Sequence, residues 1–85
     1  MKIFKISQGQ NKDYETFDSA VVVAPDPETA IIMDPQNGKP MTLNRWNEPY
    51  SDWCNSPEHV LVEYIGEAGP QFKQQCVICS SFNAG

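Results

Sequence analysis

Three consecutive valines, Val21, Val22 and Val23, constrain the fold of this chain more than any other feature. Valine is branched at Cβ and favours extended backbone, so residues 18–24 (DSAVVVA) are predicted to form a strand. Apolar side chains that do not alternate with polar ones indicate burial on both faces of a sheet. We therefore expect a central strand with a helix packed over one of its faces.

The valine strand is followed at once by a helix start. Asp26 can cap the helix, Pro27 suits its first position, and Glu28 places an acid in the first turn. Asp34 precedes Pro35, and a residue before proline is disfavoured from helical backbone. The helix is therefore expected to last about two turns.

Three further strands are predicted, over residues 3–6, 59–65 and 76–82. The last two are separated by residues 66–71, which hold two glycines and a proline and read as a turn, so an antiparallel hairpin is the simplest pairing. Residues 34–58 hold four prolines and show no sustained period, which is typical of a long loop.

The expected order is therefore β-β-α-loop-β-β within one domain of 85 residues. The predicted class is α+β: a small antiparallel sheet of three to four strands, with one short helix and a long loop that carries aromatic residues. Helix and loop are expected to cover one face of the sheet.

The net charge of the chain limits the classes of partner that it can bind. Eleven acids against six bases give a net charge of −5, and no two bases are adjacent in the sequence. Binding to nucleic acid needs clustered bases, so no direct nucleic-acid contact is predicted. Neither a signal peptide nor a membrane segment is expected, so the predicted setting is the cytoplasm, with reduced thiols and no membrane partner. An acidic domain of this kind can meet a basic surface on a larger protein.

The aromatic loop, residues 45–53 (RWNEPYSDW), is the most informative stretch for function. Two tryptophans, a tyrosine and an arginine within nine residues match the composition of interface hot spots. The same side chains could stack on a base, or the tryptophans could fold inward and cover the sheet. The interface candidates are Arg45, Trp46, Glu48, Tyr50, Asp52 and Trp53.

Cys54, His59, Cys76 and Cys79 form the one candidate metal set, because four ligands of these types can hold a tetrahedral zinc ion. The spacing argues against it: in a strand, Cys76 and Cys79 point to opposite faces, since they are an odd number of positions apart. Buried core thiols are the simpler interpretation.

Catalysis is not predicted either. Cys54 and His59 are close in sequence, but catalytic pairs are recognised by geometry and not by local spacing. No glycine-rich phosphate loop opens the helix, and the sequence calls for no cofactor.

Four stretches, MKIFKISQ, DYETFDSAVVVAPDPETA, WCNSPEHVLVEYIGEA and SSFNAG, together resemble a set of short proteins encoded by bacteriophages and prophages. The similarity spans nearly the whole chain. It carries over no activity and no catalytic or binding residue. It implies a setting, since small phage accessory proteins often bind and block a host bacterial protein, including components of antiviral defence.

The function predicted from these features is that of a non-enzymatic binding protein, which blocks a larger bacterial protein through the aromatic loop. The alternatives are a binder of a small molecule or nucleotide signal, with Arg45 or lysines on the phosphates, and a zinc-stabilised module. The chain is also predicted to be able to self-associate through an exposed sheet edge, formed by residues 3–6 or 76–82.

Overall fold

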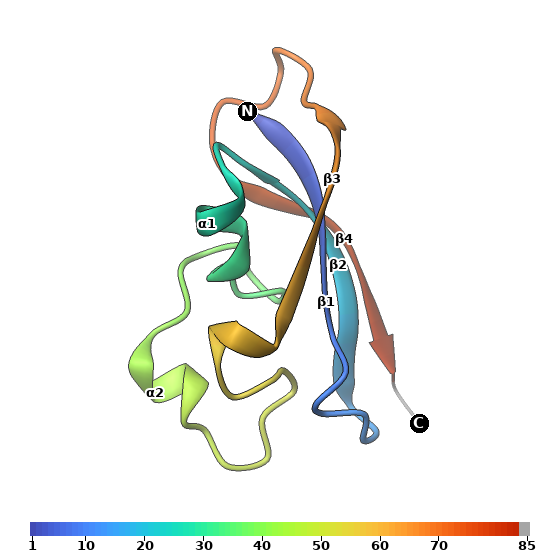
Figure 1. Ribbon diagram of the computed structural model, residues 1–85, viewed down its shortest axis with the longest axis vertical. Helices are drawn as coiled ribbons and strands as arrows, with labels where there is room; N and C mark the ends of the chain where they lie inside the picture. The colour runs from blue at the N-terminus through green and yellow to red at the C-terminus, as the bar shows by residue number, and fades with distance from the viewer. Residues whose placement is uncertain (84–85) are drawn as a thin grey trace.

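The structure, a computed structural model, describes residues 1–83. Ala84 and Gly85, the end of the SSFNAG stretch, lie outside the described residues. Four strands form one antiparallel sheet in the order β3-β1-β2-β4, as Figure 1 shows: β1 (Lys2–Gln8), β2 (Thr16–Ala24), β3 (Val60–Glu67) and β4 (Cys76–Asn83). The helical elements are short: α1 (Pro27–Ile31), α2 (Leu43–Trp46) and the 3₁₀ turn η1 (Pro57–His59). A small antiparallel sheet with short helices agrees with the predicted class at this level.

The prediction of a central valine strand is confirmed. β2 lies between β1 and β4, and both Val22 and Val23 are fully buried although they point to opposite faces. The helix start is confirmed as well, because the Asp26 carboxylate accepts a 2.7 Å hydrogen bond from the backbone N–H of Thr29, and Pro27 begins α1. α1 is shorter than the two turns expected.

The prediction of a hairpin between the last two strands is wrong. β3 pairs with β1, β4 pairs with β2, and the two strands lie at opposite edges of the sheet. The residues between β3 and β4 do form a turn, but the chain then crosses the end of the sheet to the opposite edge. A local turn signal does not say which strand is the neighbour, because pairing depends on contacts distant in sequence.

The long segment between α1 and β3 is more ordered than expected. The Thr42 hydroxyl accepts from the backbone N–H of Arg45 at the start of α2, and Ser56 caps η1 in the same manner. In Figure 1 this segment, with α1 and α2, lies on one side of the sheet, as predicted.

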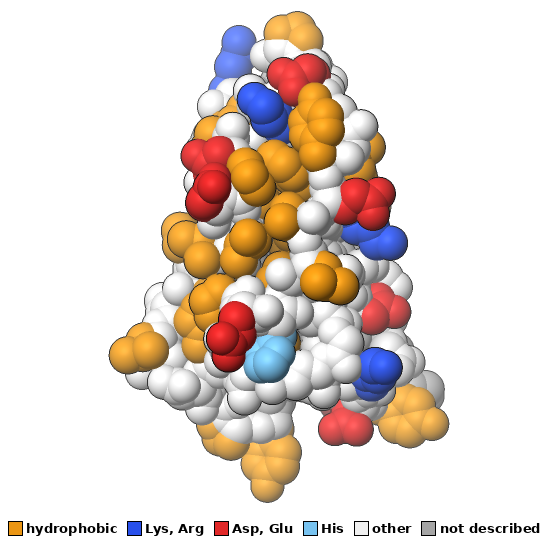
Figure 2. All heavy atoms as spheres, viewed as in Figure 1, with side chains coloured by type: hydrophobic (Ala, Val, Ile, Leu, Met, Phe, Trp, Pro, Cys, Tyr) orange, Lys and Arg blue, Asp and Glu red, His pale blue; other side chains and the backbone are white. Residues whose placement is uncertain are grey.

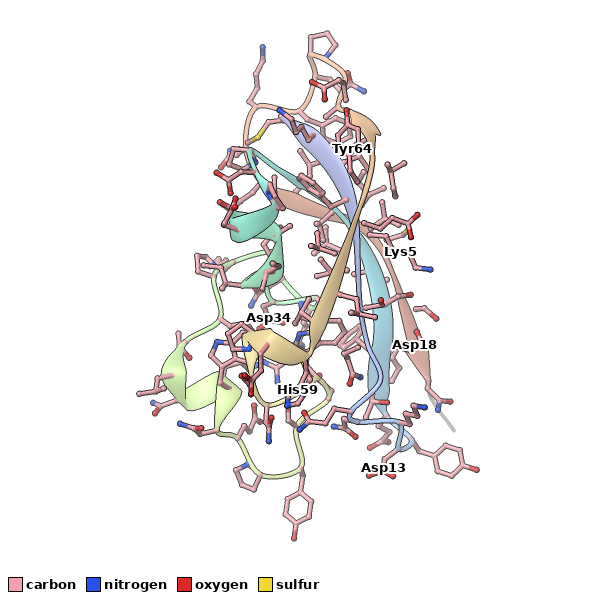
Figure 3. The ribbon with its side chains drawn as sticks, viewed as in Figure 1. Lys5, Asp13, Asp18, Asp34, His59 and Tyr64 are labelled. Atoms are coloured by element: carbon pink, nitrogen blue, oxygen red, sulfur yellow. The ribbon has the colours of Figure 1, made fainter. Side chains whose placement is uncertain are left out.

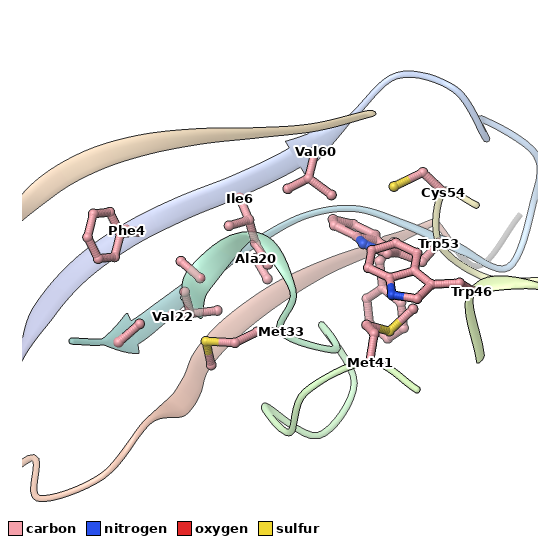
Figure 4. Close-up of a cluster of buried hydrophobic side chains, with 13 residues drawn as sticks. Phe4, Ile6, Ala20, Val22, Met33, Met41, Trp46, Trp53, Cys54 and Val60 are labelled. Carbon is pink, nitrogen blue, oxygen red and sulfur yellow. The ribbon is translucent and has the colours of Figure 1, made fainter. Parts of the chain in front are cut away.

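The core lies between the sheet and that covering layer (Figure 4). Its buried side chains come from every layer: Phe4, Ile6, Phe17, Ala20, Val22, Ala24, Ala30, Met33, Met41, Trp46, Trp53, Cys54 and Val60. No helix within residues 1–83 has the length and apolar character needed to cross a membrane.

A register shift in β4 changes the placement of two cysteines. Cys76 pairs with Val23 and Cys79 with Val21, so the shift beside Ile78 brings both cysteines opposite residues of the same sheet face. The expectation that they point to opposite faces is therefore wrong. Their expected burial is wrong too, since Cys76 is only partly buried and Cys79 is exposed.

Candidate functional site

Two loops that are distant in sequence meet at one end of the molecule. The first joins β1 to β2, and the second precedes η1. We call residues 10–16 together with residues 48–55 the tyrosine end, after Tyr14 and Tyr50. In Figure 3 the label of Asp13 marks this end of the molecule.

Two amide side chains join these loops. Gln8 donates to the carbonyl oxygens of Asn11 and Phe17, at 2.7 and 2.9 Å, and accepts from the Asn11 N–H at 2.8 Å. Asn11 donates to the carbonyl oxygens of Ser51 and Trp53, at 2.7 and 3.1 Å. A buried amide whose hydrogen bonds are made fixes the backbone around it. The tyrosine end is therefore held in one arrangement before anything binds.

The two tyrosines of this end are the prominent exposed aromatic rings. Tyr14 is 75% exposed, and Tyr50 is fully exposed. Tyr50 also has a φ of 58°, and Glu15, next to Tyr14, has a φ of 61°. These are the two non-glycine residues with positive φ in the described chain. Left-handed backbone costs an ordinary residue about 1–2 kcal/mol, and such strain tends to collect at functional sites.

A cleft of about 570 Å³ lies between the two loops. Three acids line it, Asp13, Glu15 and Glu48, and both tyrosines contribute to its walls. Among the described residues that line the cleft there is no lysine or arginine. The cleft therefore presents negative charge flanked by phenol rings, a combination that suits a cationic side chain.

Arg45 lies beside this end but is occupied by the chain itself. Its Nε bonds the Asp34 carboxylate at 3.0 Å, its Nη1 bonds Glu48 at 3.3 Å and Ser51 at 3.2 Å, and its Nη2 bonds Asp52. Burial lowers the pKa of Arg45, but the hydrogen bonds to Asp34 and Asp52 outweigh burial and raise the pKa above its ordinary value. Arg45 thus clamps the segment between α1 and η1, and its guanidinium is engaged by carboxylates of the chain itself.

The two tryptophans of the aromatic loop face inward. Trp46 is 8% exposed and Trp53 only 1%, and Figure 4 shows both indoles at the end of the core that holds Met41, Cys54 and Val60. The sequence left open whether the tryptophans contact a partner, stack on a base or cover the sheet. In the structure they cover the sheet. The predicted interface role of these two rings does not fit, because a buried ring offers no surface to a partner.

The other predicted interface residues differ in their availability. Tyr50 and Glu48 are exposed, whereas Asp52 is partly buried in its ion pair with Arg45. Tyr50 can therefore meet a partner without breaking an ion pair, and Glu48 can do so at the loss of its exposed ion pair with Arg45.

The four candidate zinc ligands are not brought together. His59 is the last residue of η1, directly before β3, and is exposed, and histidine atoms are visible at the surface in pale blue in Figure 2. Cys76 and Cys79 lie on β4 at the opposite edge of the sheet. Within residues 1–83 no group of three His, Cys, Asp or Glu side chains is placed to hold a metal. Cys54 is fully buried, and burial raises the pKa of its thiol, which opposes the formation of a nucleophilic thiolate.

Sequence reasoning missed Gln8, Asn11 and Tyr14. Gln8 follows Phe4 and Ile6 at a spacing of two, and in a strand this spacing places it on the buried face. A buried amide must find hydrogen-bond partners, so that signal was present. Asn11 and Tyr14 lie in a polar turn, and no local pattern points to either.

Comparisons with protein-family models, curated proteins and solved structures found no match to this chain.

Proposed function

We propose that this chain is a non-enzymatic binding domain that docks its tyrosine end on a basic surface of a larger protein. The observation that carries the proposal is Tyr50, a fully exposed aromatic ring on strained backbone at the rim of an acidic cleft. A tyrosine supplies a large, rigid contact area at low entropic cost, and tyrosine is enriched among the residues that dominate binding.

Strain at Tyr50 supports a role in binding. Glycine or asparagine would adopt a φ of 58° at lower cost, and the exposed ring makes no aromatic contact within residues 1–83 that offsets the strain. A residue that is unfavourable for folding and exposed to solvent fits a position used for recognition. Tyr14, beside the other strained residue, supplies a second ring.

Charge supports the choice of partner. Asp13, Glu15 and Glu48 line the cleft, and the whole chain carries a net charge of −5. Complementary potential speeds encounter with a basic surface and orients the two proteins. The resemblance to phage-encoded proteins adds a setting in which the partner is a host bacterial protein that is blocked by the contact.

A binder of nucleotide signals is less well supported. Such a site needs cations for the phosphates, and the cleft is lined by acids while Arg45 is held by carboxylates. Lys12 is the base that lies on the β1–β2 turn. One lysine beside three acids gives a phosphate little attraction.

The test compares capture of bacterial proteins by immobilised wild type, Tyr50→Ala and Leu43→Ala. Leu43 is a matched control, because it is 75% exposed but lies on α2, outside the tyrosine end. We expect a protein retained by wild type at low salt to be lost with Tyr50→Ala, kept with Leu43→Ala, and released as salt rises. Equal retention by all three chains contradicts the proposal, as does calorimetric binding of a nucleotide that is insensitive to Tyr50→Ala.

A further inference from the structure

The two edges of the sheet differ in how they resist pairing with another strand. The β3 edge carries Glu63 and Glu67, both exposed, and the Tyr64 hydroxyl donates a 2.6 Å hydrogen bond to Glu67. Two copies that met along β3 would bring these carboxylates together. Charges on an edge strand are a common device against strand-to-strand association.

The β4 edge has no such protection. Its eight residues, CVICSSFN, include no charged residue and no proline, and the six from Ile78 to Asn83 are all exposed. An edge strand presents unpaired backbone N–H and C=O groups along its free side. In a chain of net charge −5, a neutral strip is also where a second copy is repelled least.

We infer that β4 pairs antiparallel with β4 of a second copy of this chain, across a two-fold axis at Ser80, to give one continuous sheet of eight strands. Two shifts in the β2–β4 register leave Cys79, Ser80 and Ser81 as an uninterrupted run, and Ser80 is its centre. This inference stands apart from the proposed function, since it involves an edge strand and not the tyrosine end.

Apolar residues on β4 are consistent with that axis. Ile78 and Phe82 are 44% and 46% exposed, and each lies two residues from Ser80. In the two-fold arrangement Ile78 of one copy, which lies at the register shift, therefore comes near Phe82 of the other, and this contact occurs twice. An aliphatic and an aromatic side chain that are neighbours across two antiparallel strands stabilise the pairing.

Sedimentation velocity of the full chain tests the inference. We expect the sedimentation of wild type to give a molar mass twice that of one 9.6 kDa chain. Ser80→Lys places two like charges on the axis and is expected to return the mass to that of one chain, with an unchanged circular dichroism spectrum. Leu61→Lys is the matched control, because it adds the same charge to an exposed position of the other edge strand and should leave the dimer intact.

Thiol cross-linking tests the register without altering the fold. With the axis at Ser80, the two Cys79 residues are diagonal neighbours about 7–8 Å apart, whereas the two Cys76 residues are roughly 25 Å apart at about 3.4 Å per residue. A short bis-maleimide should therefore join two chains, and Cys79→Ser should abolish the product while Cys76→Ser leaves it.

A wild-type chain that sediments as a monomer up to several hundred micromolar overturns the inference. A dimer that survives Ser80→Lys but not Leu61→Lys also overturns it, since the contact would then involve β3. Partner capture that depends on Tyr50 stands or fails separately from these results.

Discussion

The side-chain amide of Asn11 donates a 2.7 Å hydrogen bond to the backbone carbonyl of Ser51, forty residues further along the chain. This contact ties the β1–β2 turn to the loop that carries Tyr50. The two strained residues and both exposed tyrosines therefore belong to one rigid unit.

Replacing Asn11 by alanine should lower the free energy of unfolding by about 2 kcal/mol, because two backbone carbonyl oxygens lose their donor. Urea denaturation measures this change. Asn44→Ala is the control, since Asn44 is exposed on α2 and should change stability by less than about 0.5 kcal/mol. Equal effects of the two variants would remove Asn11 from its linking role.

Tyr50→Gly should stabilise the fold and weaken binding at once. Glycine adopts a φ of 58° without the steric cost that tyrosine carries, and this gain exceeds the added freedom of the unfolded chain. We expect a rise of about 0.5–1 kcal/mol, or roughly 4 °C in the midpoint of thermal unfolding. Tyr14→Gly is the matched control, because Tyr14 has no positive φ, and it should not stabilise. A loss of stability in Tyr50→Gly would contradict the assignment of strain.

Arg45→Met should cost about 2–4 kcal/mol of unfolding free energy, because the buried Asp34 carboxylate loses its cation. Adding Asp34→Asn to the same chain should recover at least half of this loss, since a neutral amide needs no counter-charge. A double-mutant cycle in urea measures the coupling. Additive effects of the two changes would show that the ion pair contributes nothing.

Trp53→Ala and Trp46→Ala should each cost about 3–5 kcal/mol, the usual loss for a buried indole. A domain of this size has a total stability of about 5–10 kcal/mol, so each variant should lose about a third of it or more. Thermal unfolding followed by far-UV circular dichroism checks the outcome, with Tyr50→Ala as a folded reference. Unfolding midpoints equal to that of wild type for both tryptophan variants would contradict the burial of the two rings.

Stability should fall as the pH rises above about 9. Burial raises the pKa of Cys54 above its ordinary value of 9.0, so the unfolded chain releases this proton first and is favoured at higher pH. The contribution is complete below pH 9 and is lost as the pH approaches the folded pKa. Between pH 8 and 10.5 the free energy of unfolding, measured by denaturation, should decline more steeply for wild type than for Cys54→Ala, in which the other groups still titrate. Parallel declines in the two chains would contradict a contribution from Cys54.

The strands and the first helix could be predicted because each depends on local pattern: the valine run, the Asp26 cap and the alternation in β3. The pairing of the edge strands could not, because the β3–β4 turn carries the same signal whether the strands are neighbours or not. The register shift beside Ile78, which reverses the expected geometry of the cysteines, also leaves no mark in the sequence.

The candidate site was predicted in part. Composition singled out the aromatic loop, and Tyr50 with Glu48 does lie exposed at the cleft. Composition could not tell an exposed tyrosine from a buried tryptophan three positions away, since the side that each ring faces depends on how the loop packs over the sheet. Tyr14 reaches the cleft from another strand connection, which only the fold brings near.

The strand order also determines when the sheet can form. Neighbouring strands β1 and β2 are joined by a short turn, but both outer strands come from the last third of the sequence: Lys2 pairs with Glu67, and Thr16 pairs with Asn83. Pairing across such separations is slow, because the loop must close before its contacts form. During synthesis the β1–β2 hairpin, valine run included, leaves the ribosome with both sides open. The unfinished chain is thus the form most exposed to aggregation, and the form that chaperones would meet.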